Sequence, residues 1–504
     1  MLDKQIEFHD VVVIGAGVAG LRCASQLVHV KDIKDVLIVE ASDRIGGRVM
    51  NTMSFIPGMS VELGAEFMHG ANTTLTHLAE ELNIGLREIF TWAQGDGGPT
   101  KPTLDGGVGY YYIGDQKRML KYNDEDEEFF KFNLSVANLS NLDQIPPEKS
   151  MRDYFNEVGL SPSMMKLCEA GYANTAGGPL EDISLRTTCR YEKQWVDLED
   201  EGDYRVVPSL MRFVEYFAKG VTTRLKWPVA SVDYSQSDRI LLTSISGKQL
   251  SCCTLVVTVS TAVFSKIVYT PALPEEKVNA VNSFDMRRAG KVLLHMSGRF
   301  WPEDAHGVVC SECFLPEFWF NSTQGIGHLK HNGDKLCAEL KAVKLDDSET
   351  QYLITGFAGT LYAESFVDVP HEKIIEGFLD QLDMIYGTPD EPSPAHKFFV
   401  KGMYKDFGDE PWIGGGYAFP RVGQLDLASE DLAAAVDNRI FFAGEATAFE
   451  QPGMSVHAAV DTGTRASAQV ASALQDYKQK AGKQKCVDWN GRQSMKINDV
   501  VYHQ

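Results

Sequence analysis

The stretch "VVVIGAGVAGLRCASQL", residues 11–27, decides the fold. It opens with the apolar run Val11–Ile14, which is typical of a parallel strand buried on both faces. Three glycines at the spacing G-x-G-x-x-G follow directly, namely Gly15, Gly17 and Gly20. Apolar residues then recur at helical spacing, and a second apolar run, residues 36–39, ends in Glu40. A strand, a glycine-rich turn, a helix and a second strand within about 30 residues predict a βαβ unit of an α/β domain.

The glycine-rich turn predicts a dinucleotide site. Gly15 permits the tight turn, Gly17 lets the backbone approach a diphosphate, and Gly20 lets the helix pack closely on the strand. The start of the helix offers unpaired N–H groups and a partial positive charge to that diphosphate. Glu40 can accept hydrogen bonds from ribose hydroxyls. The alternative, a purely structural glycine loop, is disfavoured because the motif follows a strand and opens a helix.

Length and composition indicate a large, acidic globular protein. Its 504 residues exceed one ordinary domain, so two or three lobes are expected. The formal net charge of −21 argues against nucleic acid or an anionic membrane as the main partner and favours a cationic ligand. No apolar run approaches the ~20 residues that span a bilayer, and we find no secretory signal, so we expect a cytoplasmic protein without a membrane partner.

The nine cysteines are scattered and form no disulfide framework, which favours a reducing compartment. Cys310 and Cys313 have the spacing of a redox or zinc pair. A second ligand pair at suitable spacing is missing, so a structural role is favoured and no metal site is predicted.

Residues after Glu40 extend the signature. The stretch "EASDRIGGRV", residues 40–49, adds a second glycine pair between Arg44 and Arg48. In this order the chain resembles the flavin-containing amine oxidases, which include polyamine oxidases, monoamine oxidases, L-amino-acid oxidases and histone demethylases. Further matching segments are "ELGAEFMHG" (62–70), "KWPVASVDY" (226–234), "GKVLLHMSGRFWP" (290–302), "GDEPWIGGGYAF" (408–419) and "RIFFAGEATAFEQPGMSVHAAVDTGTRAS" (439–467).

The resemblance implies an α/β (α+β) fold of two lobes. A Rossmann-like FAD-binding domain would carry an inserted substrate domain built of a sheet and helices. We predict the FAD-binding domain from residues 1–75, 206–290 and 400–475. The substrate-binding domain would comprise residues 76–205 and 291–399, and residues 476–504 would form a C-terminal tail.

The resemblance also implies the residues that hold FAD. They are Gly15, Gly17, Gly20, Glu40, Arg48, Gly64, Ala65, Glu66, Val229, Glu445, Met454 and Ser455. Val229 would meet the adenine through its backbone, Glu445 would bond the ribityl or diphosphate part, and Glu62 and Gly64 would face the cofactor. Monoamine oxidases with covalent flavin carry cysteine where this chain has Gly416, so the FAD is expected to be non-covalent.

Two residues are implied to act at the flavin. Lys291 lies at the family's spacing before Phe300 and Trp301, where the family lysine holds a water against flavin N5; a snorkelling strand lysine is the alternative. Tyr417 occupies the position of one wall of an aromatic cage, whose ring faces suit an amine. The second wall falls near Met454, and the sequence leaves open whether Phe449 or Trp412 replaces it.

His69 is the residue that points to a particular amine. It occupies the position where animal polyamine oxidases carry histidine, and it would hydrogen-bond the reacting amine; a core histidine is the alternative. Asp197 and Glu199 lie where related enzymes place an acid for the distal ammonium. The alternative, that these two acids lie in a solvated loop and bind no substrate, is equally consistent with the sequence.

The resemblance thus implies an FAD-dependent oxidase of spermine, spermidine or their N-acetylated forms. A C–N bond would be oxidised to an imine that hydrolyses to aldehyde and amine, with O2 reduced to H2O2. The alternatives are an L-amino-acid or monoamine oxidase of the same family, or a flavoprotein that has lost turnover and serves as a binding or scaffold protein. The expected partners are a small cationic amine and O2, and the oligomeric state is left open.

Overall fold

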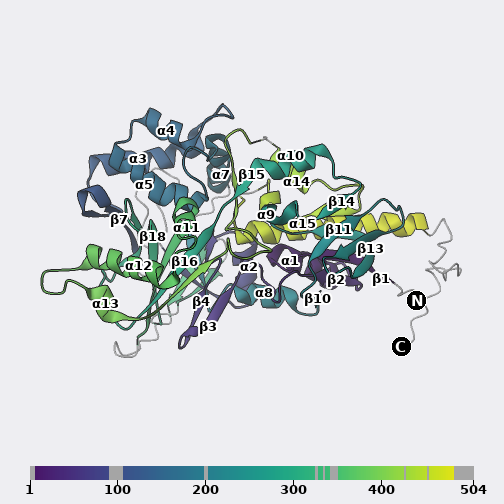
Figure 1. The fold of residues 1–504 in the computed structure, drawn as a ribbon, viewed down its shortest axis with the longest axis horizontal. Helices are drawn as coiled ribbons and strands as arrows, with labels where there is room; N and C mark the ends of the chain where they lie inside the picture. Colours follow the sequence, from purple (N-terminus) through teal and green to yellow (C-terminus); the bar gives the residue numbers. More distant parts are fainter. Residues whose placement is uncertain are drawn as a thin grey trace.

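The computed structural model places the chain around two large β-sheets with helices packed on their faces (Figure 1). It describes residues 6–89, 106–197, 202–323, 327–332, 335–340, 350–424, 427–450 and 453–481. None of the helices in this part of the chain is both long enough and apolar enough to cross a membrane.

Within the described residues, the first sheet has eight strands. Their order is β10–β2–β1–β13–β12–β11–β14, and β24 also pairs with β13. The bounds are β1 (Glu7–Ile14), β2 (Val36–Val39), β10 (Thr222–Arg224), β11 (Val229–Asp233), β12 (Ile240–Ser244), β13 (Gln249–Val257), β14 (Val268–Thr270) and β24 (Ile440–Phe442). β1 pairs in parallel with β2 and β13, and β13 pairs in parallel with β24. This parallel centre is the one that the glycine motif predicts.

The apolar run of β1 is buried on both faces, as the sequence pattern indicates. Alternate residues of Val11–Ile14 enter two different cores. The first core contains residues of α1 (Val18–His29), α8 (Met211–Ala218) and α15 (Val456–Ala481). The second contains residues of α10 (Glu275–Ser283) and α14 (Ala428–Ala433). Because helices cover both faces of the sheet, the sequence of the central strand is continuously apolar and does not alternate between polar and apolar residues.

The second sheet has seven strands among the described residues, in the order β22–β16–β21–β18–β17–β7–β8. The bounds are β7 (Val108–Ile113), β8 (Arg118–Lys121), β16 (Ala289–Met296), β17 (Ala305–Cys310), β18 (Glu317–Ser322), β21 (Tyr352–Gly359) and β22 (Phe399–Asp406). Its central strands pair antiparallel. Helix α12 (His371–Tyr386) packs on this sheet, with Ile374 and Phe378 in one core with Val292 and Leu294 of β16.

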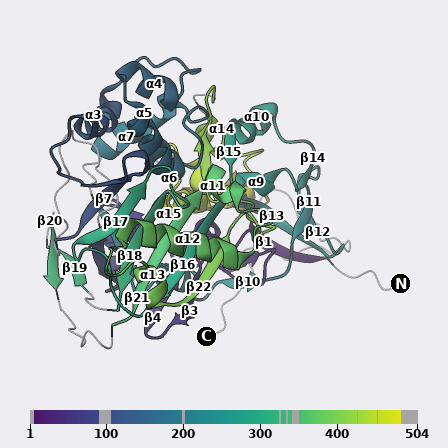
Figure 2. The same cartoon turned by 60° about the vertical axis from the view of Figure 1, so that its left-hand side comes forward.

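A group of helices stands at one end of the second sheet (Figure 2). Its members are α3 (Glu127–Ala137), α4 (Met151–Val158), α5 (Pro162–Cys168) and α7 (Leu185–Asp197). Their apolar faces share one core with Tyr111 of β7 and Val309 of β17. The group therefore lies against the second sheet and presents α7 to the region between the two sheets.

A small three-stranded sheet brings distant segments together. β5 (Phe67–His69) and β6 (Gly85–Ile89) both pair antiparallel with β9 (Asp203–Val207). The register sets Phe67 opposite Arg205 and His69 opposite Asp203. β3 (Asn51–Ile56) and β4 (Met59–Glu62) form a hairpin just before it.

The remaining elements are short connections. They are α2 (Thr74–Glu81), α6 (Asn174–Ala176), α9 (Thr261–Phe264), α11 (Thr360–Ser365), α13 (Pro394–Phe398), β15 (Phe284–Met286), β19 (Gly327–Asn332), β20 (Lys335–Leu340) and β23 (Ala418–Pro420), with short turns of helix at η1 (Gly114–Gln116), η2 (Asn138–Asn141), η3 (Glu169–Ala173) and η5 (Glu445–Thr447).

The α/β fold predicted from the sequence is confirmed, while two segment limits differ from the strand and helix bounds. β22 (Phe399–Asp406) lies, apart from its first residue, in the segment predicted for the FAD-binding domain, yet it pairs with β16 in the second sheet. α15 continues to Ala481, past the predicted start of the tail at residue 476. Strand pairing across more than a hundred residues is invisible to local sequence patterns, which explains the first difference.

Candidate active site

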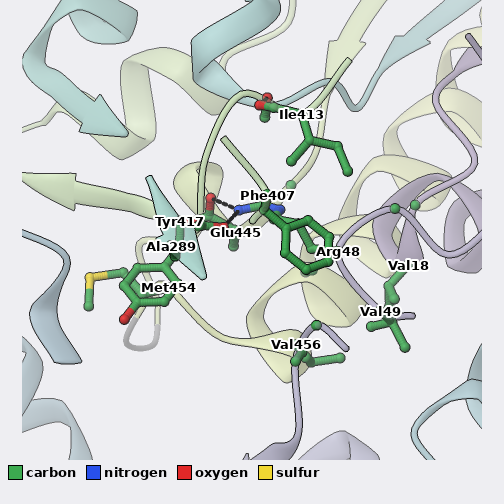
Figure 3. A pocket seen from close by; sticks show the side chains of 18 of the residues that line it. Val18, Arg48, Val49, Ala289, Phe407, Ile413, Tyr417, Glu445, Met454 and Val456 are labelled. Carbon is green, nitrogen blue, oxygen red and sulfur yellow. Dashed lines mark hydrogen bonds and ion pairs between the residues drawn. The ribbon is translucent and has the colours of Figure 1, made fainter. Parts of the chain in front are cut away.

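One large cavity, of about 830 Å³, is lined by residues from both sheets. This volume lies near the upper end of the ~300–1,000 Å³ range of small-molecule sites. The first sheet contributes the glycine-rich turn and Glu40, and the second contributes Lys291 and Glu317. Figure 3 shows Arg48, Phe407 and Tyr417 among the side chains that line this cavity.

The glycine-rich turn forms one end of the cavity and is built as predicted. Gly17 is the N-cap of α1, and a Cβ placed on it would meet no heavy atom within 4 Å. A Cβ on Gly20 would instead lie 2.1 Å from the carbonyl oxygen of Gly15. Gly17 therefore leaves room for a ligand, whereas Gly20 is required for the helix to approach the strand.

Glu40 stabilises this end of the cavity. Its Oε2 accepts a hydrogen bond from the Ala16 amide at 2.7 Å. Its Oε1 accepts from the amide and the hydroxyl of Ser42, each at 2.8 Å. Each carboxylate oxygen can accept more than one hydrogen bond, so Glu40 can hold the loops and still bind ribose hydroxyls. Val229, the predicted adenine contact at the start of β11, lines the same cavity.

Arg48, from the segment after β2, and Glu445, from the segment before α15, are bonded to each other in the predicted cofactor site (Figure 3). Arg48 Nη1 donates to Glu445 Oε1 at 2.8 Å and to the Gly416 carbonyl at 3.0 Å. Glu445 Oε1 also accepts from the Ala418 amide at 3.2 Å. The buried Oε2 of Glu445 has no hydrogen-bond partner among the residues that the structure describes. An unpaired buried acceptor is costly, so this oxygen fits a hydroxyl of a bound cofactor such as the ribityl chain of FAD.

The start of α15 forms another part of the cavity wall. Met454 and Ser455 line the cavity and precede the first helical residue, Val456. The Ser455 hydroxyl caps the helix by accepting from the Ala458 amide at 3.2 Å. A helix N-terminus carries a partial positive charge, which suits the anionic reduced form of a flavin.

Lys291 lies at the cavity wall, with a partner that the sequence did not identify. Its Nζ donates to Glu66 Oε2 at 2.7 Å. The Nε and Nη2 atoms of Arg205 donate to the other oxygen, Glu66 Oε1, at 3.0 and 2.9 Å. Burial alone would raise the pKa of Glu66, but Lys291 and Arg205 together hold it below its usual value. Glu66, expected to bind the cofactor, therefore has both carboxylate oxygens bound to cations.

Gly64 and Ala65 line the cavity, but Glu62 differs from its expected place beside the cofactor. Its Oε1 accepts the Leu210 amide at 2.9 Å, just before α8 begins, and Glu62 is not among the residues lining the cavity. Burial raises the pKa of Glu62 to about 7. Its carboxylate is thus bound at the start of α8.

His69 faces the cavity and is bound to a buried acid. Its Nδ1 lies 2.5 Å from Oδ1 of Asp203, which is only 4% exposed at its side chain. Burial alone would lower the pKa of His69, but the Asp203 carboxylate raises it above its usual value. A second histidine near it, His457, has its pKa lowered to about 3, first by burial and then by His69. The pair thus divides into a histidine that takes up a proton readily and one that stays neutral.

Tyr417 lines the cavity with its hydroxyl donated to the Thr175 carbonyl. Burial raises its pKa. Of the two aromatic residues considered for the second wall, Trp412 lines the cavity, whereas the Phe449 ring lies against the Arg465 guanidinium at 5.3 Å.

Tyr191 of α7 is a third aromatic candidate for that wall. It lines the cavity, and its hydroxyl lies 3.3 Å from the position that a Cβ on Gly453 would occupy, next to Met454. No local sequence pattern predicts Tyr191 as a cavity residue, because α7 belongs to a segment without a recognisable motif.

Two half-buried carboxylates that were not among the predicted acids line the cavity. Glu317 Oε2 accepts from Asn174 Nδ2 and Thr175 Oγ1, each at 3.3 Å, and burial raises the pKa of Glu317 to about 7. Glu192 Oε1 accepts from the Tyr172 hydroxyl at 2.8 Å, and burial raises its pKa as well. A carboxylate in an otherwise apolar strand, "PEFWF", was the available signal for Glu317.

The predicted acids lie at the edge of what the structure describes. Asp197 is the last residue of α7, and its side chain lies outside the described residues; so does the whole of Glu199. Their role as substrate ligands stays a prediction.

The fold and the cavity together define a protein that binds a dinucleotide cofactor between a Rossmann-like sheet and a second sheet. The chain belongs to the family of flavin-containing amine oxidoreductases, whose sequence profile matches residues 18–471. The cofactor of this family is FAD, and the glycine-rich turn, Glu40 and Glu445 fit it. The resemblance inferred from the sequence is therefore confirmed at the level of the family.

Two relatives illustrate the range of the family. The chain is 28% identical over 489 residues to Lysine-specific histone demethylase 2 of Homo sapiens, covering 94% of this chain and 54% of that protein. It thus spans about half the length of the histone demethylases that it matches. It is 25% identical over 476 residues to Polyamine oxidase 3 of Oryza sativa subsp. japonica, covering 90% of this chain and 88% of that protein.

Solved structures support the fold. Cyclohexylamine oxidase from Brevibacterium oxydans IH-35A aligns with a TM-score of 0.73 at 21% identity, covering 93% of this chain and 99% of that one. Wild-type putrescine oxidase bound to putrescine aligns with a TM-score of 0.70 at 19% identity, covering 92% and 99%.

Proposed function

We propose that this protein is an FAD-dependent oxidase of polyamines, acting on spermine, spermidine or their N-acetylated forms. The observation that carries the proposal is the half-buried Glu317 carboxylate, which lines the same cavity as His69 and Tyr417. When bound, FAD supplies the oxidation by accepting a hydride equivalent from the carbon beside the amine nitrogen and passing the electrons to O2 to form H2O2. The resulting imine hydrolyses to an aldehyde and an amine.

The FAD is proposed to be non-covalent. Gly416 stands where flavinylated relatives carry cysteine, and a Cβ on it would lie 2.6 Å from the Cβ of Ala289. Any side chain at this position would force β16 and the Gly416 loop apart, which supports a cofactor held by hydrogen bonds and charge alone.

His69 is proposed to bind the reacting amine. Asp203 holds Nδ1, so Nε2 is the ring nitrogen through which His69 would contact a substrate. A protonated imidazole stabilises the neutral form of a neighbouring amine. Only a neutral amine can lose a hydride equivalent from the carbon next to its nitrogen. The rings of Tyr417 and Tyr191 would flank the reacting nitrogen of the substrate amine.

Glu317 is proposed to bind the distal ammonium, with Glu192 as a second acid on the same wall. A cation beside Glu317 stabilises the ionised carboxylate and recovers the cost of its burial. Both arginines that line the described cavity are already bound, Arg44 to the Gly47 carbonyl and Arg48 to Glu445. This arrangement disfavours an L-amino acid, whose carboxylate needs a cation.

The test is peroxide release from α,ω-diamines and polyamines compared with monoamines of equal length, in wild type and Glu317→Gln. Because charged hydrogen bonds contribute about 1.5–3 kcal/mol, the variant should lose about 10- to 100-fold in kcat/KM for substrates with a second ammonium. Monoamine oxidation should change little. Glu376→Gln, an exposed site outside the cavity, is the control. Equal losses for both substrate classes would refute the assignment of Glu317.

A second candidate is demethylation of a lysine in a histone tail. It is favoured by the 28% identity to Lysine-specific histone demethylase 2 and by the acidic charge of the chain. Peroxide release from methylated lysine peptides, with no release from free polyamines, would select this function instead.

A further inference from the structure

The Glu66 carboxylate lies between two cations and gives one oxygen to each. Lys291 binds Oε2 from the cavity side, and both Lys291 and Glu66 line the cavity. Arg205 binds Oε1 with two donors. Arg205 also lines a small second pocket with Arg87 and His306, which Phe67 and Trp319 separate from the main cavity. The three side chains therefore form a row that runs from the cavity wall into the protein.

The position of the Lys291 ammonium is further restricted by two neighbours. Its Nζ also donates to the Glu62 carbonyl at 3.4 Å and lies 5.4 Å from the centre of the Trp319 ring. The side chains of the row are almost fully buried: Lys291 is 8% exposed, Glu66 4% and Arg205 9%. Each comes from a different segment, because Lys291 is on β16, Arg205 on β9 and Glu66 just before β5.

We propose that Glu66 is the positioning residue for Lys291: its carboxylate keeps the ammonium charged and fixed at the cavity wall beside the flavin, and Arg205 anchors that carboxylate from behind. Two buried cations without the carboxylate would repel each other, and a buried ammonium without a counter-ion gives up its proton. The proposal rests on the FAD-binding family and not on the proposed polyamine substrate.

Other charged groups near the row cannot replace Glu66. The titratable residues around it are Glu62, His69, Asp203, Arg87, His306, Glu317 and Lys405. The carboxylate of Glu62 accepts the Leu210 amide at the start of α8, and the ion-pair partner of both Lys291 and Arg205 is Glu66. Asp203 is bound to His69, and Lys405 to Glu410. Removing the Glu66 charge therefore leaves the row with an uncompensated pair of cations.

The test is a pH titration of the holoenzyme, recording the absorption spectrum and the midpoint potential of the bound flavin. Wild type, Glu66→Gln and the double variant Glu66→Gln/Lys291→Met are compared. Glu66→Gln should gain a pH-dependent step absent from wild type, because Lys291 then lies buried near Arg205 without its counter-ion and gives up its proton more readily. The step should disappear in the double variant. A merely structural role for Glu66 would change stability without creating a step that depends on Lys291.

The control is Asp304→Asn, which breaks the 2.6 Å contact of Asp304 with Lys121 away from the cavity and should leave the flavin titration unchanged. If Glu66→Gln does not retain FAD, Glu66→Asp decides: it keeps the charge but shortens the reach, and should shift the same step by a smaller amount. The proposal would be overturned if the flavin of Glu66→Gln titrated as in wild type. If Glu66→Gln does not retain FAD, the same result in Glu66→Asp would overturn it. So would a step that persists in the double variant.

Discussion

The Nδ1 atom of His69 lies 2.5 Å from Oδ1 of Asp203, although 134 residues separate the two along the chain. The antiparallel register of β5 and β9 places them opposite each other. Asp203 is buried, so its charge acts on His69 with little screening and raises the pKa of the imidazole above its usual value. The histidine expected at the reacting amine is thus part of an acid–histidine pair.

Asp203→Asn should lower the pH at which His69 titrates, because the carboxylate is the source of the raised pKa. The measurement is the pH profile of kcat/KM for the best amine. The ionisation should move to lower pH in Asp203→Asn and be missing in His69→Ala. Identical profiles in all three proteins would show that His69 is a core histidine.

Binding of a doubly charged amine should strengthen as the pH rises through about 7. Glu317 has a pKa raised to about 7 by burial, so it is protonated below that pH and anionic above it. The log of kcat/KM for a diamine should therefore rise through this range in wild type and lose that rise in Glu317→Gln. A monoamine provides the internal control, since its nitrogen titrates but does not need Glu317. A rise shared by both substrates and both proteins would assign it to another group.

Lys291→Met should slow reoxidation of the reduced flavin by O2. The variant removes the cavity-wall ammonium and leaves Glu66 bound to Arg205. Loss of one preorganised electrostatic donor costs about 10²–10³-fold in rate at other active sites. Stopped-flow mixing of the reduced holoenzyme with oxygenated buffer measures it. Reductive and oxidative half-reactions that both match wild type would remove Lys291 from the chemistry.

Gly17→Ala and Gly20→Ala should fail in different ways. A Cβ at Gly17 meets no protein atom, so the flavin-free variant should unfold at the wild-type temperature while binding FAD poorly. A Cβ at Gly20 meets the Gly15 carbonyl oxygen at 2.1 Å, so the flavin-free variant should itself unfold at a lower temperature. Thermal unfolding with and without FAD separates the two effects. Equal unfolding temperatures of the two flavin-free variants would contradict the packing role of Gly20.

The cofactor end of the site could be predicted from the sequence because its parts are local. The glycines and Glu40 lie within one βαβ unit, where motif and spacing fix the geometry. Asp203 and Arg205 could not be predicted, and the carboxylate in the apolar strand around Glu317 did not by itself indicate that it lines the cavity. All three reach the site through strand pairings with segments far away in the chain, and neither the register of β5 on β9 nor the place of β18 in the second sheet leaves a local pattern.

Side-chain direction limited the prediction in the segment from Glu62 to His69. The order of residues identified a strip beside the cofactor, and Gly64, Ala65 and His69 do line the cavity. Glu62 and Glu66 were both assigned to the cofactor. Glu62 binds the start of α8, whereas Glu66 lines the cavity and binds Lys291 and Arg205, so its contact with the cofactor stays a prediction. The partners of both acids lie far along the chain, Leu210 for Glu62 and Arg205 and Lys291 for Glu66.

The central claim, oxidation of a polyamine at this site, is tested most directly by anaerobic mixing of the holoenzyme with a panel of amines. The panel contains spermine, spermidine, N-acetylspermine, a monoamine, L-amino acids and a methylated lysine peptide, and the readout is bleaching of the flavin absorption. We expect a polyamine to bleach the flavin fastest and the amino acids to leave it yellow. A flavin that no amine bleaches, or that only the methylated peptide bleaches, would contradict the proposed function.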